Sequence, residues 1–393
     1  MIAGIILLFN LFYSANFSVV TPVMPLIIEE YDVSRGAASF LMSGVLIVQA
    51  VFVIPGGMLV AKTPLRHVFS IGCVVAAAMG LTFLADHFAA LLALRFIHAL
   101  AFVVIMPATA PILMRWFDAR ELPVMNSLHM TFFILGIGVG TLASGPMSSA
   151  IGWQATLIIF GAAMLGVGAL WVVFGRVPPP TEERRVRRVS LRDMLGAVRA
   201  KTILLLGLAD GAAFAQNLAL TTWLPTYYNE VFDMSLTKAG SIVGLVSMIG
   251  VVASLTGGFL SARLEVRKPF LIIPGAMAGL AGIACFLFQN EAVIYAGIIG
   301  LGIASFLYLP VLMTIPMEIK GLSEGQVAVA WATMFAVATT VATIAPITVG
   351  FMTDWLGSFV PGFTLWAVLS LGLLVVGLMV PETGPRARLA RRQ

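Results

Sequence analysis

The sequence predicts an all-α integral membrane protein with twelve transmembrane helices in two pseudo-symmetric six-helix bundles. Three observations support this prediction. The chain has 393 residues, of which 60% are hydrophobic and 10% are charged, so its charged side chains are too few to cover a surface that faces water. Long apolar runs recur along the whole chain, and part of the first half recurs in the second half.

The apolar runs are long and continuous enough to cross a bilayer as helices. A helix rises about 1.5 Å per residue, so about 20 residues cross roughly 30 Å of hydrocarbon. Transmembrane β-strands would instead alternate in polarity over about ten residues. The predicted spans lie near residues 2–24, 36–60, 66–85, 88–114, 122–148, 153–174, 203–228, 237–261, 269–288, 292–317, 325–350 and 360–380.

The internal repeat has a constant offset of 201 residues, which relates Gly56 to Gly257 and Arg66 to Arg267. In so apolar a chain, a half-length repeat is typical of a transporter built from two similar bundles with its pathway between them. The predicted parts are an N-terminal bundle at residues 1–175, a basic cytoplasmic linker at 176–201, a C-terminal bundle at 202–380 and a cytoplasmic tail at 381–393.

The basic residues indicate the orientation of the chain. They concentrate in alternate turns, in the linker and in the tail, so the positive-inside rule predicts that both termini are cytoplasmic. The linker could lie on membrane lipids or serve as a solvated connector. Topology also explains the net charge of +5, so no nucleic-acid partner is predicted. The turns on the basic side carry Lys62, Arg66, Arg115, Arg120, Arg263, Arg267, Lys268 and Lys320.

The two cysteines and the first apolar run carry little functional signal. Cys73 and Cys285 fall inside predicted spans, where they are most simply small apolar residues. The first run lacks a basic segment before it, so it is interpreted as a retained span. No cofactor and no metal site are predicted, because the sequence offers no cluster of metal ligands and no nucleotide-binding loop.

Four ionisable side chains at membrane depth are the strongest candidates for a transport pathway: Arg95, His98, His129 and Asp210. A charge at mid-span costs roughly 2.5 to 3.5 kcal/mol on insertion scales, so such groups face protein or water. Arg95 and His98 make the predicted cavity positive and are expected to bind the substrate. Asp210 and His129 are expected to couple transport to a proton, with His98 as a further candidate for that role.

Polar and aromatic residues complete the predicted site. Asn16 and Asn217 are related by the repeat offset, and their amides could hydrogen-bond a polar substrate or join neighbouring helices. Tyr13, Tyr308 and Trp331 are weaker candidates for the apolar part of the site, because lipid contact or core packing is the commoner role of such residues.

The chain resembles the major facilitator superfamily (MFS) over essentially its whole length. The resemblance implies the MFS fold and a gating role for the repeated loop, through Gly57, Arg66, Gly258 and Arg267. The acid that the family usually carries in this loop is Ala61 here and Ala262 in the second copy, so a differently built latch is expected. The matching motifs are Gly57 to Lys62 with Arg66-His67, Arg95 to Ala99, Gly136 with Gly140 and Gly145-Pro146, and Gly152-Trp153-Gln154.

The resemblance also bears on the substrate. Asn16 stands where proton-driven drug antiporters of the family usually have an aspartate, and an amide cannot release a proton. The run from Thr222 to Tyr228 is similar to the organic-anion and cyanate-type branches, although the first-span arginine of the cyanate branch is absent. The predicted function is secondary active transport of a small anionic, organic acid-like solute by alternating access, coupled to a proton. The alternative is a multidrug/proton antiporter.

Further expectations follow from this prediction. The protein is not expected to be an enzyme, since no nucleophile with a base is evident in the sequence. It is expected in the cell (inner or plasma) membrane, with a small-molecule substrate, membrane lipids and a coupling ion as its partners. A complete pathway within one chain predicts a functional monomer.

Overall fold

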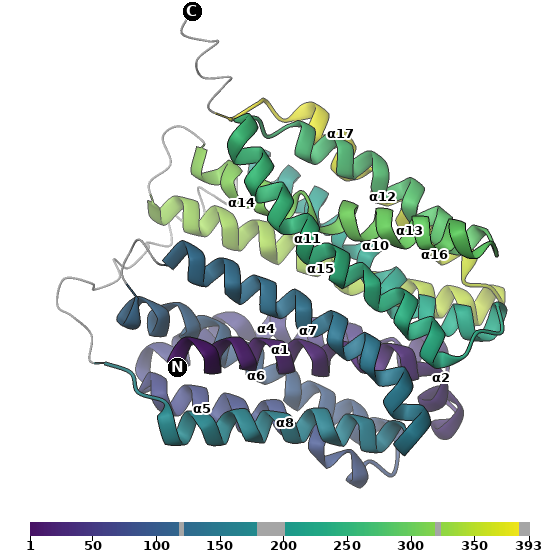
Figure 1. Ribbon diagram of the computed structural model, residues 1–393, viewed down its shortest axis with the longest axis horizontal. Coiled ribbons are helices and arrows are strands. Elements are labelled where there is room, and N and C mark those ends of the chain that lie inside the picture. Colours follow the sequence, from purple (N-terminus) through teal and green to yellow (C-terminus); the bar gives the residue numbers. More distant parts are fainter. Residues whose placement is uncertain (118–121, 179–200, 319–323, 385–393) are drawn as a thin grey trace, which may run out of the picture. The chain divides into compact units, whose positions relative to one another are not determined.

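The computed structural model describes residues 1–117, 122–178, 201–318 and 324–384, and these form helices without a strand among them (Figure 1). Residues 179–200 of the predicted linker (176–201) and residues 385–393 of the predicted tail (381–393) lie outside the described residues. The helices are α1 Ile2–Ser18, α2 Val20–Tyr31, α3 Arg35–Ala38, α4 Phe40–Lys62, α5 Leu65–Ala76, η1 Ala77–Leu84, α6 Phe88–Trp116, α7 Leu122–Ile151, α8 Trp153–Phe174, α10 Lys201–Val231, α11 Leu236–Leu264, α12 Pro269–Leu287, α13 Glu291–Phe306, α14 Leu309–Glu318, α15 Glu324–Leu356, α16 Val360–Leu369 and α17 Gly372–Met379.

The helices provide twelve segments that are long and apolar enough to cross a membrane. The predicted fold class and number of spans are therefore confirmed. Several spans consist of two helices in series: α1 with α2, α5 with η1, α13 with α14, and α16 with α17. The chain is a multi-pass membrane protein.

The break in the first span has a local cause. Pro22 has no backbone N–H, so it cannot donate to the carbonyl oxygen of Ser18 four residues earlier. The hydroxyl of Thr21 donates to that oxygen instead, at 3.0 Å. Side-chain compensation of this kind is what allows proline in a membrane helix.

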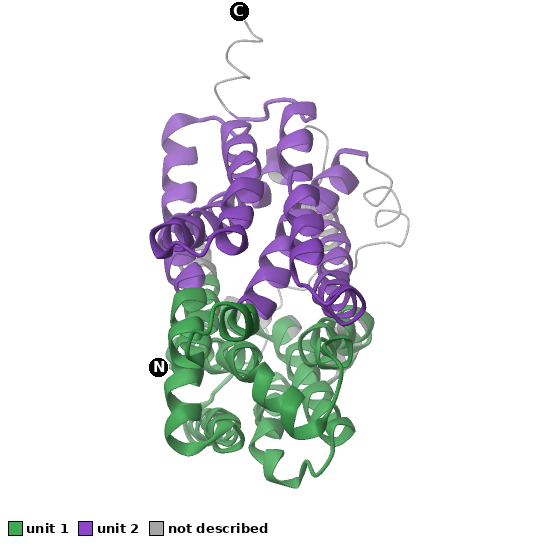
Figure 2. Cartoon of the chain, turned by 90° about the vertical axis from the view of Figure 1, so that its right-hand side faces the viewer, with its two compact units in different colours: residues 1–185, 225–244 green, residues 186–224, 245–393 purple. Residues whose placement is uncertain are grey.

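The structure divides into two compact units, which Figure 2 distinguishes by colour. Unit 1 comprises residues 1–185 and 225–244, and unit 2 comprises residues 186–224 and 245–393. Within unit 1, Arg35 pairs with Glu230 at 2.6 Å, and the backbone of Thr237 lies against Gly145. These contacts place residues 225–244 in unit 1, although they belong to the second predicted bundle. The compact units and the repeat are different divisions of the chain, and the repeat boundaries stay a prediction.

Each unit has an apolar core of its own. In unit 1, α1, α5, α6 and α8 contribute to a cluster that includes Phe69 and Trp171. In unit 2, α10, α12, α14, α15 and α17 contribute to a cluster that includes Leu206 and Leu312. Both cysteines are free and buried, as expected of small apolar residues.

Glycine allows a close helix contact in unit 1, between α1 and α7. A Cβ atom added at Gly136 would meet the carbonyl oxygen of Leu11, and one added at Gly140 would meet the carbonyl oxygen of Ala15. The hydroxyl of Ser18 also donates across this contact to the carbonyl of Ile137, at 2.7 Å. The glycines of the fifth span thus form a face on which α7 contacts α1.

Candidate functional site

Arg95 is fully buried in unit 1 and joins three membrane segments. Its Nε donates to the carbonyl of Leu41 at 2.8 Å, Nη1 donates to the carbonyl of Asn16 at 2.8 Å, and Nη2 donates to the carbonyl of Phe17 at 3.0 Å. The last two carbonyls precede the break between α1 and α2. The guanidinium group is therefore held by backbone oxygens in this structure, and its predicted role as an anion ligand stays a prediction.

His98 lies one helical turn from Arg95 and is also fully buried. Its ring stacks on Tyr13, with ring centroids 4.6 Å apart and planes 9° apart. Nδ1 lies 2.8 Å from the carbonyl oxygen of Ala76. A carbonyl only accepts, so Nδ1 carries the proton. Nε2 has no hydrogen-bond partner among the described residues. Tyr13 in turn accepts a hydrogen bond from Gln49 at 3.1 Å.

The repeat-equivalent asparagines have different environments. Asn16 is fully buried and donates to the carbonyl of Phe160 at 2.7 Å, so it joins α1 to α8. Asn217 is partly exposed on α10 and donates to the hydroxyl of Ser305 at 3.0 Å. Asn16 thus makes an interhelical contact, which is one of the two roles that the sequence left open, whereas Asn217 has a partly exposed amide. The role of either residue in binding substrate stays a prediction.

His129 has a partner that the sequence analysis did not identify. The side-chain nitrogen of Asn10 lies 2.6 Å from Nδ1 of His129, and both residues are buried between α1 and α7. With the amide nitrogen assigned to this contact, Nδ1 accepts and Nε2 carries the proton. Asn10 lies one helical turn before Tyr13 on α1, so the sequence already placed it on the same helix face as a predicted site residue.

Asp210 forms the corresponding polar centre of unit 2. Its Oδ1 accepts a hydrogen bond from the hydroxyl of Tyr308 at 2.8 Å. Tyr308 lies in the break between α13 and α14, where non-helical backbone is tolerated because protein surrounds it. Trp331 donates to the sulfur of Met313 at 2.7 Å and stacks on Phe335 with centroids 5.8 Å apart. A small pocket is lined by Asp210, Leu312, Met313, Trp331, Met334 and Phe335.

The structure therefore collects seven of the predicted substrate-binding and proton-coupling residues into two groups, whereas Asn217 and His129 have separate partners. One group in unit 1 connects Arg95 to Asn16 and His98 to Tyr13 through the contacts above. The other group lies in unit 2, where Asp210 accepts a hydrogen bond from Tyr308 and lines a pocket together with Trp331. In the described part of the chain, no group of three His, Cys, Asp or Glu residues is arranged to hold a metal ion.

The close glycine contacts of the repeated loop lie one residue before the predicted gating glycines. An added Cβ at Gly56 would meet Val103 of α6, and one at Gly257 would meet the carbonyl oxygen of Leu307. At Gly258 the nearest neighbour is Pro310, at an ordinary 3.6 Å. Gly57 lies in α4, and its surroundings fall outside the described part of the structure. Helix packing therefore depends on Gly56 and Gly257, and the gating role of Gly57 and Gly258 stays a prediction.

The two predicted gating arginines have different partners. Arg66 donates from Nη2 to the carbonyl of Val172 at 2.9 Å, in the last turn of α8. Arg267 donates from Nη2 to Glu318 at 2.8 Å and from Nη1 to the carbonyl of Ser261 at 2.7 Å. In the second copy of the repeated loop, the arginine thus pairs with an acid, Glu318, at the end of α14. The equivalent position in the first copy is Phe117, which has no charge.

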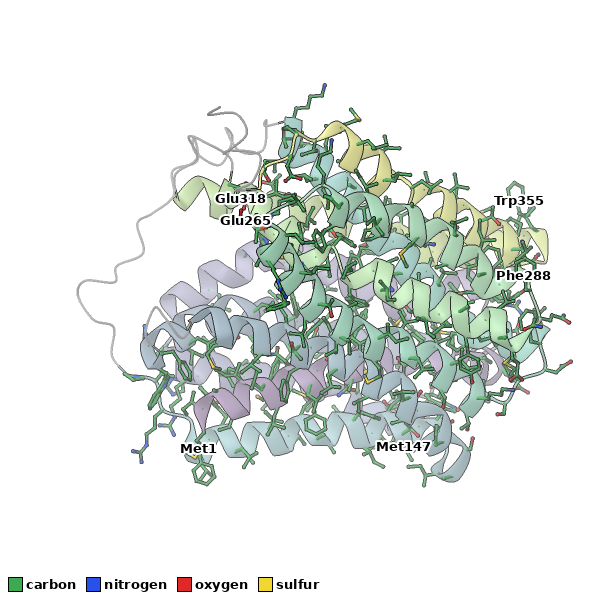
Figure 3. The ribbon with its side chains drawn as sticks, turned by 45° about the horizontal axis from the view of Figure 1, so that its top comes forward. Met1, Met147, Glu265, Phe288, Glu318 and Trp355 are labelled. Atoms are coloured by element: carbon green, nitrogen blue, oxygen red, sulfur yellow. The ribbon has the colours of Figure 1, made fainter. Side chains whose placement is uncertain are left out.

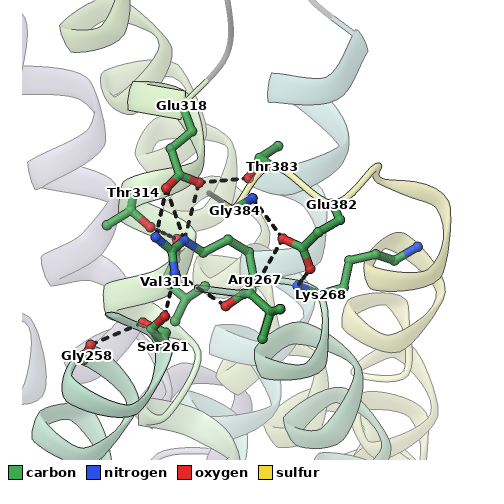
Figure 4. Close-up of polar contacts among 11 residues, drawn as sticks. Gly258, Ser261, Arg267, Lys268, Val311, Thr314, Glu318, Glu382, Thr383 and Gly384 are labelled. Carbon is green, nitrogen blue, oxygen red and sulfur yellow. Dashed lines mark hydrogen bonds and ion pairs between the residues drawn. The ribbon is translucent and has the colours of Figure 1, made fainter. Parts of the chain in front are cut away.

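The segment after α17, residues 382–384, contributes to the contacts around Arg267 (Figure 4). The carboxylate of Glu382 accepts from the backbone N–H groups of Arg267 and Lys268 at 2.8 and 3.0 Å. Thr383 donates to Glu318 at 2.9 Å. Because α12 begins at Pro269, Glu382 places a negative charge at the N-terminus of that helix, where the helix dipole favours it.

Loss of the Glu318 charge is expected to destabilise unit 2. In Glu318→Gln, Arg267 keeps its charge but loses its anionic partner and can bind only a neutral amide oxygen, which lowers the free energy of unfolding by about 2 kcal/mol. The thermal midpoint of the purified protein in detergent measures this effect. Glu265→Gln is the matched control, because Glu265 lies at the same end of unit 2 (Figure 3) and is exposed. Equal midpoints for both variants would contradict the prediction.

Comparison with known proteins identifies the family. The family model described as Major Facilitator Superfamily matches residues 6–343. The chain belongs to the Major Facilitator Superfamily. It is therefore a membrane transporter, and the family resemblance noted in the sequence is confirmed.

Two relatives of this MFS transporter are named for organic acids. The probable sulfoacetate transporter SauU of Cupriavidus necator is 26% identical over 377 residues, which cover 89% of this chain and 86% of that protein. The probable galactarate/D-glucarate transporter GudP of Escherichia coli is 23% identical over 340 residues, covering 76% of this chain and 74% of that protein.

A solved structure supports the fold. A bacterial homolog of the human lysosomal transporter Spinster, in an inward-facing and unoccupied conformation, matches with a TM-score of 0.79 and 17% identity. The match covers 95% of each chain. At this identity the likeness shows the fold alone.

Proposed function

We propose that this MFS transporter moves a small organic anion by alternating access, in symport with a proton. The observation that carries the proposal is the similarity along 89% of the chain to a protein named as a probable sulfoacetate transporter. The buried carboxyl of Asp210 and the buried ring of His129 support the proton-coupled part, because ionisable groups at membrane depth mark ion or proton pathways.

The positive-inside distribution supports a location in the cell (inner or plasma) membrane with both termini cytoplasmic. The functional unit of this proposal is one chain surrounded by membrane lipids. Within it, Arg95, His98, Asn16, Asn217, Tyr13, Tyr308 and Trp331 remain the proposed substrate-binding residues, while Asp210 and His129 remain the proposed proton carriers. Gly57, Arg66, Gly258 and Arg267 remain the proposed gating residues.

Uptake into proteoliposomes tests the proposal. Labelled sulfoacetate or D-glucarate is expected to accumulate several-fold inside vesicles when the outside is more acidic, because proton entry drives anion entry. Vesicles without protein and vesicles with equal pH on both sides are the controls. Ethidium efflux driven by the same gradient, without uptake of either acid, would instead support the multidrug/proton antiporter.

A further inference from the structure

Asp210 is a buried carboxyl without a cationic partner among the described residues. The ion pairs of Arg35 with Glu230 and of Arg267 with Glu318 do not involve Asp210. Asp210 is 8% exposed. Gly207 and Gly211 flank it on α10 and let α15 come close, since an added Cβ at Gly211 would lie 3.0 Å from Cα of Ala338. An unpaired carboxylate in such a place costs free energy that a bound cation or proton would remove.

The elements around Asp210 present little that could neutralise it. The core cluster that includes Ala209, the residue before Asp210, receives the apolar Leu271 from α12 and Leu373 and Val376 from α17. From α14 and α15, the pocket walls are carbon, sulfur and aromatic rings. Among the described side chains, Tyr308 is the titratable group in contact with Asp210, and it already donates its proton to Oδ1.

The oxygen count of the pocket distinguishes a proton from a metal cation. A hard metal cation is bound by several oxygen ligands, as in the six or more around Mg²⁺ or Ca²⁺. Among the side chains that line this pocket, Asp210 supplies the carboxyl oxygens, and the Tyr308 hydroxyl bound to Oδ1 adds one more oxygen next to it. A proton needs only the carboxyl oxygen, so the pocket fits a proton better than a metal ion.

We propose that the proton on Asp210 is also the group that binds the acid end of the substrate. This inference rests on the proposed function and adds the binding chemistry of its site. Oδ1 of Asp210 stays bound to Tyr308, and the protonated Oδ2 donates to a carboxylate or sulfonate oxygen of the substrate. Such an O–H···O⁻ hydrogen bond is short and strong. The apolar part of the acid then packs against Trp331.

In this arrangement, electrostatic repulsion couples the binding of the anion to the binding of a proton. With Asp210 ionised, an incoming anion would meet a like charge in a pocket of low polarity, and the two would repel. With one proton shared between them, the pair carries a single negative charge. The proton is therefore required for binding, and one proton accompanies each anion.

Binding by the wild-type protein gives a test that needs no variant. Sulfoacetate and D-glucarate are titrated by calorimetry into the purified full chain between pH 5.5 and 8.5, in Na⁺-containing and Na⁺-free buffers. Above the titration range of the site, the dissociation constant is expected to rise about tenfold per pH unit, because one proton is taken up with the anion. Above the same range, in weak buffer with a pH indicator, one proton per bound anion is expected to leave solution.

Variants at Asp210 locate the effect. Asp210→Asn keeps an N–H donor but cannot titrate, so it is expected to bind both acids with a dissociation constant that does not change with pH. Asp210→Ala removes the donor and is expected to bind at least tenfold more weakly than Asp210→Asn. Asp86→Asn makes the same chemical change at an exposed position and is expected to behave as wild type. Size-exclusion chromatography confirms that each variant is folded.

Several outcomes would overturn the inference. These are pH-independent binding by the wild type, no uptake of a proton on binding above the titration range of the site, a strict requirement for Na⁺, or an unchanged pH dependence in Asp210→Asn. Any of them leaves the proposed anion transport standing. Absence of binding by the wild type to either acid at every pH would contradict the proposed function and this inference together.

Discussion

Arg95→Met is expected to prevent this transporter from folding stably in the membrane. The substitution removes three hydrogen bonds between a charged donor and the carbonyls of Leu41, Asn16 and Phe17, each worth about 1.5 to 3 kcal/mol. Removal of a buried charge offsets part of this loss. We expect a net loss of at least about 3 kcal/mol, seen as a low yield of monodisperse protein and a lower thermal midpoint.

Two further variants make the Arg95 result interpretable. Arg95→Lys is expected to fail in the same way, because one ammonium group cannot reach carbonyls on α1 and α4 together. Arg66→Met is the control: Arg66 is exposed and binds a single carbonyl, so its loss is expected to cost no more than about 1 kcal/mol. If Arg95→Met were as stable as wild type but bound no anion, the sequence-based role of Arg95 as an anion ligand would be correct.

Gly140→Ala is expected to destabilise unit 1 although alanine is the better helix former. The added methyl group would meet the carbonyl oxygen of Ala15 and the hydroxyl of Ser18 on α1. Backbone cannot move aside as a flexible side chain does, so α1 and α7 must separate. We expect a cost of about 2 kcal/mol or more, measured as a fall in thermal midpoint.

Gly166→Ala in α8 is the matched control for Gly140→Ala. Gly166 is exposed, and an added Cβ there would meet no atom within 4 Å. The exchange gives the same gain in helix propensity, up to about 1 kcal/mol, without the clash. A Gly140→Ala protein as stable as the Gly166→Ala protein would show that the α1–α7 contact can widen at little cost.

The repeat illustrates where sequence reasoning stops. Positions 201 residues apart share residue types, which led to equal roles for Asn16 and Asn217. The structure separates them because their neighbours differ: Asn16 reaches the backbone of α8, whereas Asn217 reaches Ser305. The arginines of the repeated loop differ in the same way, since Arg267 binds the carboxylate of Glu318, whereas Arg66 binds the backbone carbonyl of Val172.

The sequence by itself determined the solvent, the number of spans and the family of this protein. Those properties depend on sums over many residues: apolar length against bilayer thickness, and motifs in a fixed register. It also identified Arg95, His98, His129 and Asp210 as candidates, because an ionisable side chain at membrane depth is energetically costly and therefore usually has a functional role.

Only the tertiary structure decided what each selected residue touches. Asn10 became the partner of His129, Tyr308 the partner of Asp210, and backbone carbonyls the partners of Arg95. A hydrogen bond depends on positions within a few tenths of an ångström, and those positions follow from where helices break and where glycine lets them meet. The polarity of the spans gives neither the distances nor the directions between them, so these partners could be identified only from the packed helices.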